Sequence, residues 1–288
     1  MKTTRRAAVL AAALALAGCG QPAAPSNKDD KGGPGAAPPA NIPSGPVAPT
    51  DASSVAAQKI VGDLLTGAAD TTKFATPFIK AVGLPATTPE DKAKGYSPAA
   101  AHAWLTRAGA ALTQIGPPDG FTASTSAVFT GMNGTGRYLV RMAQAEGAWK
   151  ADFFGVGTAK ANEVDKPKTA DEAFQDFAVL GLLDALTSTA LPTDDRVPLA
   201  AALLSAKARA GMAGPFPADQ EQGYDYNRGK LGVVADGLGK GATAVTRTRT
   251  GADTFRVQIT KDGAARAFAV KLVRDPAGGW VVDEFKPE

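Results

Sequence analysis

Apolar residues from position 51 onward recur every three or four positions, which is the spacing of a helix with one buried face. This spacing predicts three successive helices, over about 53–66, 74–82 and 98–112. Ser97 and Pro98 favour the start of the third helix, because Ser is a good N-cap residue and Pro suits the first helical position.

After the third helix the apolar period changes from near four to two, which indicates strands. Three strands are predicted over 121–130, 137–143 and 148–154, with turns at Asn133-Gly134 and at 145–147. The second half of the chain repeats this order. Its predicted helices lie around 174–183, at 199–210 and at 229–238, and its predicted strands lie at 244–250, 254–260, 265–274 and 280–285.

Short sequence matches accompany the repeated order. The segment 138–142 resembles 268–272, and a Trp-x-x-Asp-x-Phe pattern occurs at 149–154 and again at 280–285. We therefore predict an α+β protein with two tandem domains, 51–160 and 165–288. In each domain, helices are expected to pack on a curved antiparallel sheet.

Helices followed by an antiparallel sheet whose last strand starts Gly-x-Trp resemble the nuclear transport factor two-like superfamily, a cone-shaped α+β fold. The resemblance covers each half once. It implies that helices cover the concave face of each sheet and leave a pocket at the open end. Members include isomerases, dehydratases and cyclases as well as proteins that only bind, so the resemblance does not select a function.

Residues 1–18 have the pattern of an export signal. Three basic residues precede twelve uncharged, mainly apolar residues, which are too few to span a bilayer of about 30 Å. The segment ends Leu16-Ala17-Gly18-Cys19, which resembles the lipobox of bacterial lipoproteins. The resemblance implies cleavage between Gly18 and Cys19 and a diacylglycerol on the Cys19 thiol. It also implies the exported face of a bacterial cell envelope, on the outer membrane if the host has one.

Residues 19–50 are rich in Pro, Gly and Ala and contain almost no large apolar side chains to offset the entropy of ordering. We predict a disordered tether that begins at the lipidated cysteine. Its r.m.s. reach as a flexible chain is about 30 Å.

The charge balance changes when the signal is removed. The 288 residues include 31 Lys and Arg against 28 Asp and Glu, but Lys2, Arg5 and Arg6 lie in the signal, so the mature chain is formally neutral. A neutral exported chain disfavours nucleic acid as a partner. The single Cys and single His exclude an intramolecular disulfide framework and metal sites built from several Cys or His residues. No cofactor motif is present, so we expect no cofactor and no metal.

Two aspartates are candidate bases. Asp152 and Asp283 each follow a tryptophan by three residues in a predicted final strand, and a buried carboxylate there could act as a base with a raised pKa. We favour the alternative that each acid lies at an exposed strand end or pairs with Arg141 or Lys271 on a neighbouring strand.

His102 lies beside the apolar stripe of the third helix, and no orienting carboxylate is marked for it, so we favour a structural histidine. Tyr96 and Tyr224 are candidate pocket residues, although core packing with a wet hydroxyl is the commoner use of tyrosine. Arg247 and Arg249 fall on one face of a predicted strand. We expect that face to be solvated rather than to bind an anionic polymer.

These observations favour a non-enzymatic, lipid-anchored envelope protein that contacts the membrane through its lipid and binds a small ligand or an envelope protein. One alternative is an enzyme of the isomerase or dehydratase type that uses an Asp or His base. A second alternative is a structural spacer without a pocket.

Overall fold

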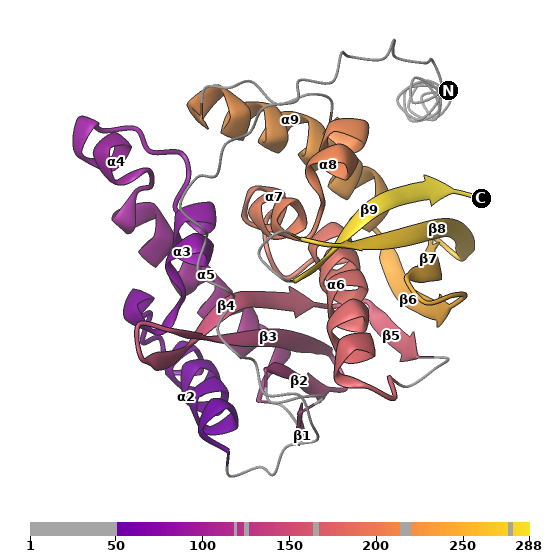
Figure 1. The fold of residues 1–288 in the computed structure, drawn as a ribbon, viewed down its shortest axis with the longest axis horizontal. Helices are drawn as coiled ribbons and strands as arrows, with labels where there is room; N and C mark the ends of the chain where they lie inside the picture. The colour runs from indigo at the N-terminus through magenta and orange to yellow at the C-terminus, as the bar shows by residue number, and fades with distance from the viewer. Residues whose placement is uncertain (1–50, 118–119, 124–126, 164–166, 214–219, 276–278) are drawn as a thin grey trace, which may run out of the picture. The chain divides into compact units, whose positions relative to one another are not determined.

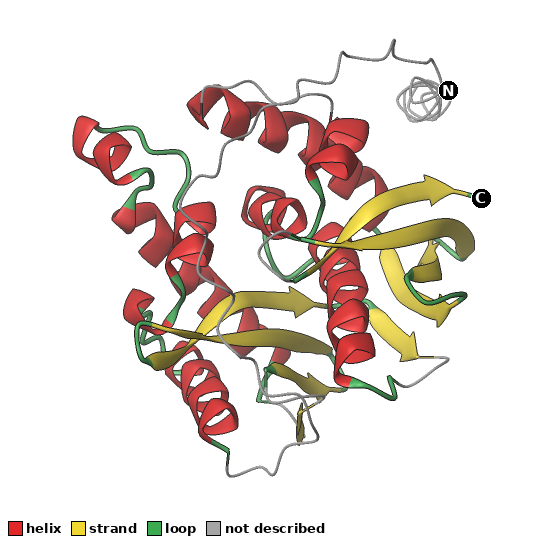
Figure 2. Cartoon of the chain, in the orientation of Figure 1, coloured by secondary structure: helices red, strands yellow, loops and turns green. Residues whose placement is uncertain are grey.

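The computed structural model describes residues 51–117, 120–123, 127–163, 167–213, 220–275 and 279–288. The predicted signal, Cys19 and the predicted tether lie outside these residues. The described chain is an α+β protein whose helices pack on two sheets (Figures 1 and 2), which confirms the expected fold class.

The first half contributes a four-stranded antiparallel sheet, here called sheet 1, with strand order β1-β2-β3-β4. Its helical segments are α2 (Ala52–Leu65), the 3-10 turn η2 (Thr71–Lys73), α3 (Thr76–Val82), α4 (Pro89–Lys94) and α5 (Pro98–Ile115). Its strands are β1 (Gly120–Ala123), β2 (Val128–Asn133), β3 (Gly136–Ala145) and β4 (Ala148–Gly157).

The second half contributes most of a five-stranded sheet, here called sheet 2, with strand order β5-β6-β7-β8-β9. Strand β5 (Lys160–Glu163) pairs parallel to β6, and the other neighbours pair antiparallel. The helices are α6 (Ala170–Thr187), α7 (Thr193–Ala202), α8 (Ala206–Ala213) and α9 (Gln220–Gly239). The strands are β6 (Ala242–Arg249), β7 (Thr254–Lys261), β8 (Ala264–Arg274) and β9 (Trp280–Pro287).

Helix starts agree with the cap chemistry of the sequence. The Ser97 hydroxyl accepts a hydrogen bond from the Ala100 N–H at 3.3 Å, as an N-cap does, at the predicted start of α5. Thr169 caps α6 in the same way, accepting from the Glu172 N–H at 3.1 Å. The carboxylate of Glu172 in turn accepts a hydrogen bond from the Lys168 N–H at 2.6 Å, so the backbone N–H groups of Lys168 and Glu172 both have side-chain partners.

Two predicted elements were wrong in detail, and two observed elements were not predicted. The predicted strand 121–130 is divided between β1 and β2. The predicted helix 199–210 is interrupted, because α7 ends at Ala202 and the backbone of Leu203 and Ser205 then hydrogen-bonds to Val282 of β9 instead of continuing the helix. Helix α4 and strand β5 were not predicted; both are shorter than the windows over which periodicity can be recognised.

Sheet 1 is covered by helices on both faces. Helices α2 and α5 pack on one face of β3 and β4. Helix α6 packs on the other face, where the Phe177 ring meets the Phe153 ring edge-on with centroids 5.2 Å apart. A Cβ at Gly157 of β4 would overlap the Asp184 carboxylate of α6, so this glycine allows the close approach of helix and strand.

Helix α6 is the central element of the described fold. It contacts β4 of sheet 1 as well as β6 and β9 of sheet 2, and Figure 1 shows it between the two sheets. Every residue from Gln175 to Thr187 is buried, although an ordinary surface helix exposes one face. Residues of both halves join one hydrophobic cluster, and the division into two domains stays a prediction.

The last strand of each half meets the same two irregularities. An isolated parallel bridge joins Phe74 to Ala151 in the first half and Leu204 to Val282 in the second half. In each case the strand pairing then shifts register at the next residue, which is Asp152 in β4 and Asp283 in β9. The Trp-x-x-Asp-x-Phe pattern therefore marks a recurring β-bulge, with the Asp as the extra residue.

Helix crossings and ring contacts recur as well. A Cβ at Gly109 of α5 would clash with the Leu64 carbonyl of α2, and a Cβ at Gly239 of α9 would clash with the Leu186 carbonyl of α6. Next to each bulge, two aromatic rings stack on one face of the sheet: Tyr138 stacks on Phe154 in sheet 1, and Phe268 stacks on Phe285 in sheet 2. The two halves thus repeat one arrangement of helix pair, bridge, bulge and ring stack.

The sheet faces opposite the ring stacks differ between the two halves. On sheet 1, the pairs Arg141–Phe153 and Arg137–Gly157 lie under α6. At the corresponding positions of sheet 2, Lys271 pairs with Glu284, and Glu288 bonds to Ala267. These side chains are exposed or partly exposed. Where sheet 1 presents packing surface to a helix, sheet 2 presents charged residues to solvent.

Candidate functional site

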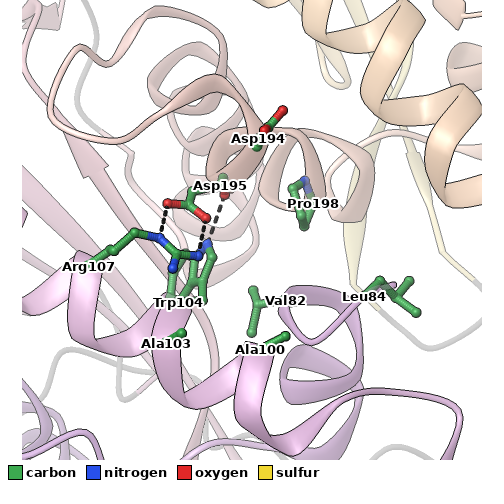
Figure 3. A pocket seen from close by; sticks show the side chains of 9 residues that line it. All are labelled: Val82, Leu84, Ala100, Ala103, Trp104, Arg107, Asp194, Asp195 and Pro198. Carbon is green, nitrogen blue, oxygen red and sulfur yellow. Dashed lines mark hydrogen bonds and ion pairs between the residues drawn. The ribbon is translucent and has the colours of Figure 1, made fainter. Parts of the chain in front are cut away.

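A cavity of about 250 Å³ lies where α3 and α5 of the first half meet α7 of the second half (Figure 3). Its wall combines apolar side chains with polar groups, which include those of one arginine and two aspartates. The lining residues are Val82, Leu84, Ala100, Ala103, Trp104, Arg107, Asp194, Asp195 and Pro198.

Ordinary helix spacing brings these residues together. The four lining residues of α5 occupy positions i, i+3, i+4 and i+7 from Ala100, so they share one helix face. On α7, Asp194 and Pro198 are four residues apart and face the cavity together with Asp195 (Figure 3). The two halves therefore supply opposite walls of the same cavity.

An ion pair and a backbone contact join these walls. The Arg107 Nε and Nη2 groups donate to the two carboxylate oxygens of Asp195 at 2.6 and 2.7 Å. The Trp104 indole N–H donates to the Asp195 carbonyl at 3.0 Å. The Asp195 side chain is only 7% exposed, whereas the Arg107 side chain is 48% exposed. The bidentate geometry of the ion pair fixes α5 against α7. The hydrogen bond of the Trp104 indole N–H satisfies the one polar group of that side chain.

The chemistry of the wall suits binding. Among the described residues that line the cavity, none is a Ser, Cys, His or Lys, so no nucleophile with an adjacent base is present there. Asp195 already accepts two hydrogen bonds from Arg107, and Asp194 is exposed in the first turn of α7. An occupant of the cavity therefore meets both apolar side chains and polar groups.

The two candidate aspartates lie outside this cavity, on the bulges of β4 and β9. Arg141 Nε lies 2.9 and 3.1 Å from the two oxygens of Asp152. Asp283 accepts hydrogen bonds from Lys207 Nζ at 2.8 Å and from the Ser205 hydroxyl at 2.7 Å. The Lys207 ammonium, helped by Ser205, holds the pKa of Asp283 below its ordinary value, against a smaller opposing effect of burial.

The other candidate residues are separate from the aspartates. His102 is exposed on α5, and its Nδ1 lies 3.0 Å from the Ala69 carbonyl. Tyr96 is partly buried and packs against the core just before α5. Tyr224 belongs to α9, but its side chain lies outside the described part of the structure. Neither His102 nor Tyr96 lines the cavity.

Sequence reasoning missed a buried ion pair between the halves. Arg137 of β3 donates to both carboxylate oxygens of Asp184 of α6, with Nε 3.1 Å from Oδ2, and its Nη1 donates to the Ala159 carbonyl at 2.5 Å. The two side chains are 4% and 1% exposed. Burial raises the pKa of Asp184, and the attraction of Arg137 opposes this shift.

The expectation of a solvated arginine face on β6 was wrong. Arg247 and Arg249 point toward α6, where their Nη2 atoms lie 3.5 and 3.2 Å from carboxylate oxygens of Asp176. Strand alternation places the two arginines on one face correctly, but it does not reveal which face a helix covers. The available signal was the occurrence of two aspartates, 176 and 184, within an otherwise apolar helical segment.

The described ranges contain neither a candidate metal cluster nor a candidate membrane-spanning helix. No three His, Cys, Asp or Glu side chains in these ranges are grouped closely enough to hold a metal ion. None of the helices described there has both the length and the apolar character needed to cross a bilayer.

Comparison with known protein families finds no matching family, and comparison with curated proteins finds no significant match. Among solved structures, the chain is similar to a cystatin-like protein from Ruminococcus gnavus ATCC 29149. The sequence identity is 15%, the match covers 81% of this chain and 86% of that chain, and the TM-score is 0.18. A score this low carries no argument about fold or function.

Proposed function

We propose that the chain is a lipid-anchored binding protein of a bacterial cell envelope, which holds a small ligand in the cavity between α5 and α7. The anchor follows from the lipobox-like Leu16–Cys19 segment, and the tether of residues 19–50 sets the binding body away from the lipid surface. Descent of both halves from the nuclear transport factor two-like superfamily is part of the same proposal, because each half repeats helices followed by an antiparallel sheet.

The cavity is the observation that supports binding. Its volume of about 250 Å³ is below the range of about 300–1,000 Å³ for sites that hold drug-sized ligands. The occupant is therefore a small molecule or a single side chain of a partner. Because both halves line the cavity, an occupant would contact them simultaneously and stabilise their packing.

The enzyme hypothesis finds less support in the geometry. Asp152 and Asp283 are each held by a cation within hydrogen-bond distance, and both lie outside the cavity. A general base needs access to a substrate proton, which these ion pairs obstruct.

Filling the cavity tests the binding function. We expect cyclohexylmethanol, a small neutral apolar probe, to bind the full chain in lipid nanodiscs, as measured by chemical-shift changes in the Trp104 indole N–H signal. Ala103→Phe should abolish this binding because the new ring occupies the cavity. Ala110→Phe on the exposed side of α5 is the matched control and should bind normally. Equal binding by both variants would refute the cavity as the site.

Lipid labelling tests the anchor. Wild-type chain expressed in a bacterium fed radiolabelled palmitate should incorporate label and sediment with membranes. Cys19→Ser should incorporate none, because the only thiol of the chain is gone. Equal labelling of the two proteins, or none in either, would contradict the lipoprotein assignment.

A further inference from the structure

The turn between β2 and β3 contains a reactive dipeptide. Asn133-Gly134 is the single Asn-Gly pair of the 288-residue chain. The backbone nitrogen of the residue after an asparagine can attack the side-chain amide carbon, and glycine hinders this attack least because it has no Cβ. Gly134 is exposed, and a Cβ placed on it would meet nothing within 4 Å. No neighbouring side chain therefore crowds this position.

The reaction needs only the chain itself and water. The Gly134 nitrogen bonds to the Asn133 side-chain carbon, and the bond from that carbon to Nδ2 breaks. The proton lost by Gly134 leaves with Nδ2 as ammonia. One water molecule then opens the cyclic imide, which gives aspartate or isoaspartate. Asparagine is for this reason among the thermolabile residues of proteins.

Hydrogen bonds on both ends of the Asn133 amide hold it in place. Its Nδ2 group donates to the carbonyls of three successive residues at the end of α5, which are Ile115 at 2.5 Å, Gly116 at 3.2 Å and Pro117 at 3.3 Å. Its Oδ1 atom accepts from the Thr135 N–H and hydroxyl at 2.9 and 2.8 Å and from the Gly136 N–H at 3.0 Å. The last carbonyls of a helix have no partner within that helix, so Asn133 caps α5 from the hairpin.

The backbone of Asn133 also opposes the reaction. Asn133 is the last residue of β2 and pairs with Gly136 of β3. Ring closure brings the Asn133 Cβ into the plane of the following peptide bond, whereas extended strand backbone holds Cβ out of that plane. The end of the hairpin must therefore unpair, and the amide must leave its partners, before Gly134 can attack. The free energy of this local opening slows the reaction.

We infer that Asn133 is a deamidation site protected by the fold, which reacts when the junction between α5 and the β2–β3 hairpin opens. The product has a carboxylate oxygen in place of the Nδ2 donor, so it would face the Ile115 and Gly116 carbonyl oxygens without a hydrogen to share. Conversion would thus prevent the junction from reforming and make an opening event irreversible.

Conversion rates test the protection. Mass spectrometry of the tryptic peptide that contains Asn133 measures them at one pH and temperature. We expect the full chain in nanodiscs to convert at least about tenfold more slowly than the chain unfolded in guanidinium chloride. Tenfold corresponds to about 1.4 kcal/mol, which the loss of several hydrogen bonds exceeds. Equal rates would overturn the protection, and no conversion of the unfolded chain would overturn the site.

A hydroxyl deletion tests the assigned contacts. Thr135 Oγ1 donates to the Ile115 carbonyl at 2.6 Å and also bonds to Asn133 Oδ1. Thr135→Val should therefore accelerate conversion in the folded chain. Thr243→Val, the same change at an exposed position of β6, is the matched control and should not. Equal rates in the two variants would overturn the assignment of the protection to these hydrogen bonds.

The product itself can be imitated by substitution. Asn133→Asp should lower the equilibrium constant for folding by at least about tenfold, because acceptors then oppose the carbonyls at the end of α5. Asn162→Asp makes the same change at an exposed position of β5 and should have little effect. Urea denaturation of the full chain provides the measurement. Equal midpoints for the two variants would overturn the irreversible step.

Discussion

Buried charges of single residues hold the two halves together. Arg137 and Asp184 are both almost fully buried, and each would be left without its counter-ion if the other were removed. A charge in that position is costly because desolvation is no longer offset by the partner. The pair thus fixes which face of α6 meets sheet 1, whatever its net contribution to stability.

Removing one partner should be more damaging than removing both. We expect Arg137→Met to lower the free energy of unfolding by about 3–5 kcal/mol, since Asp184 stays buried without its cation. The double variant Arg137→Met/Asp184→Leu should recover much of this loss. Urea denaturation provides the measurement, with Arg256→Met as control, because the Arg256–Glu288 pair is exposed and should contribute about 0–1 kcal/mol. A single-variant loss no larger than that of the control would contradict the buried-pair argument.

Asp283 should make stability depend on acid pH. Its pKa is below the ordinary value of 3.8 in the folded chain, so its stabilising effect is present above that value and is lost as the pH falls through the folded pKa. The difference in unfolding free energy between wild type and Asp283→Asn should therefore be larger at pH 7 than near pH 2. Denaturant titrations at several pH values would measure it. A difference in unfolding free energy that grows toward low pH would contradict the lowered pKa of Asp283 in the folded chain.

At the scale of elements, close approach depends on glycines. Gly109 and Gly239 let α5 and α9 touch the backbone of α2 and α6, and Gly157 admits the Asp184 carboxylate against β4. An added methyl group at any of these positions must displace backbone or a buried ion pair. Flexible side chains, which could rotate away, are not the obstacle.

Gly157→Ala should lower the free energy of unfolding by about 1–3 kcal/mol, the usual effect of overpacking. Gly134→Ala is the control, because a Cβ at Gly134 meets nothing within 4 Å and its φ is not positive. Chemical denaturation of the two variants tests the difference. Equal effects would show that the α6 contact tolerates an additional methyl group.

Periodicity identified most helices and strands but not their irregularities. The spacing of apolar residues located α2, α5 and strands β6 to β9 of sheet 2, because each has a long run of one period. The Trp-x-x-Asp-x-Phe pattern was visible, but its meaning as a bulge depends on hydrogen bonds to a neighbouring strand. The cavity was missed because its walls come from α5 and α7, which are about ninety residues apart in sequence.

At the scale of the whole molecule, the described halves share one hydrophobic core. Helix α6 begins the second half in sequence, yet it packs against β4 of the first half as well as β6 and β9 of its own. Neither half could therefore bury its apolar surface fully without the other. This predicts cooperative unfolding of the body.

Tryptophan variants can test that cooperativity. Trp104 on α5 and Trp149 on β4 belong to the first half, and Trp280 on β9 belongs to the second. Of the three tryptophans, Trp104→Phe/Trp149→Phe therefore leaves only the reporter of the second half, and Trp280→Phe leaves only those of the first. We expect the urea midpoint from fluorescence to equal that from circular dichroism in both variants, because both sheets unfold together. Two separate midpoints, assigned to different halves by the two variants, would show independent unfolding.

The charged outer face of sheet 2 limits what copies of the chain can do to one another. In the first half the corresponding surface is covered by α6 of the second half. By position alone, the same surface of sheet 2 could therefore be covered by a helix of another copy of the chain. Lys271, Glu284 and Glu288 would lose hydration in such a contact. The outward side of α2 places the polar Gln58 and Lys59 beside the exposed Val55, so it offers little apolar surface in return. Crowding many copies on one surface would then leave separate particles instead of growing filaments.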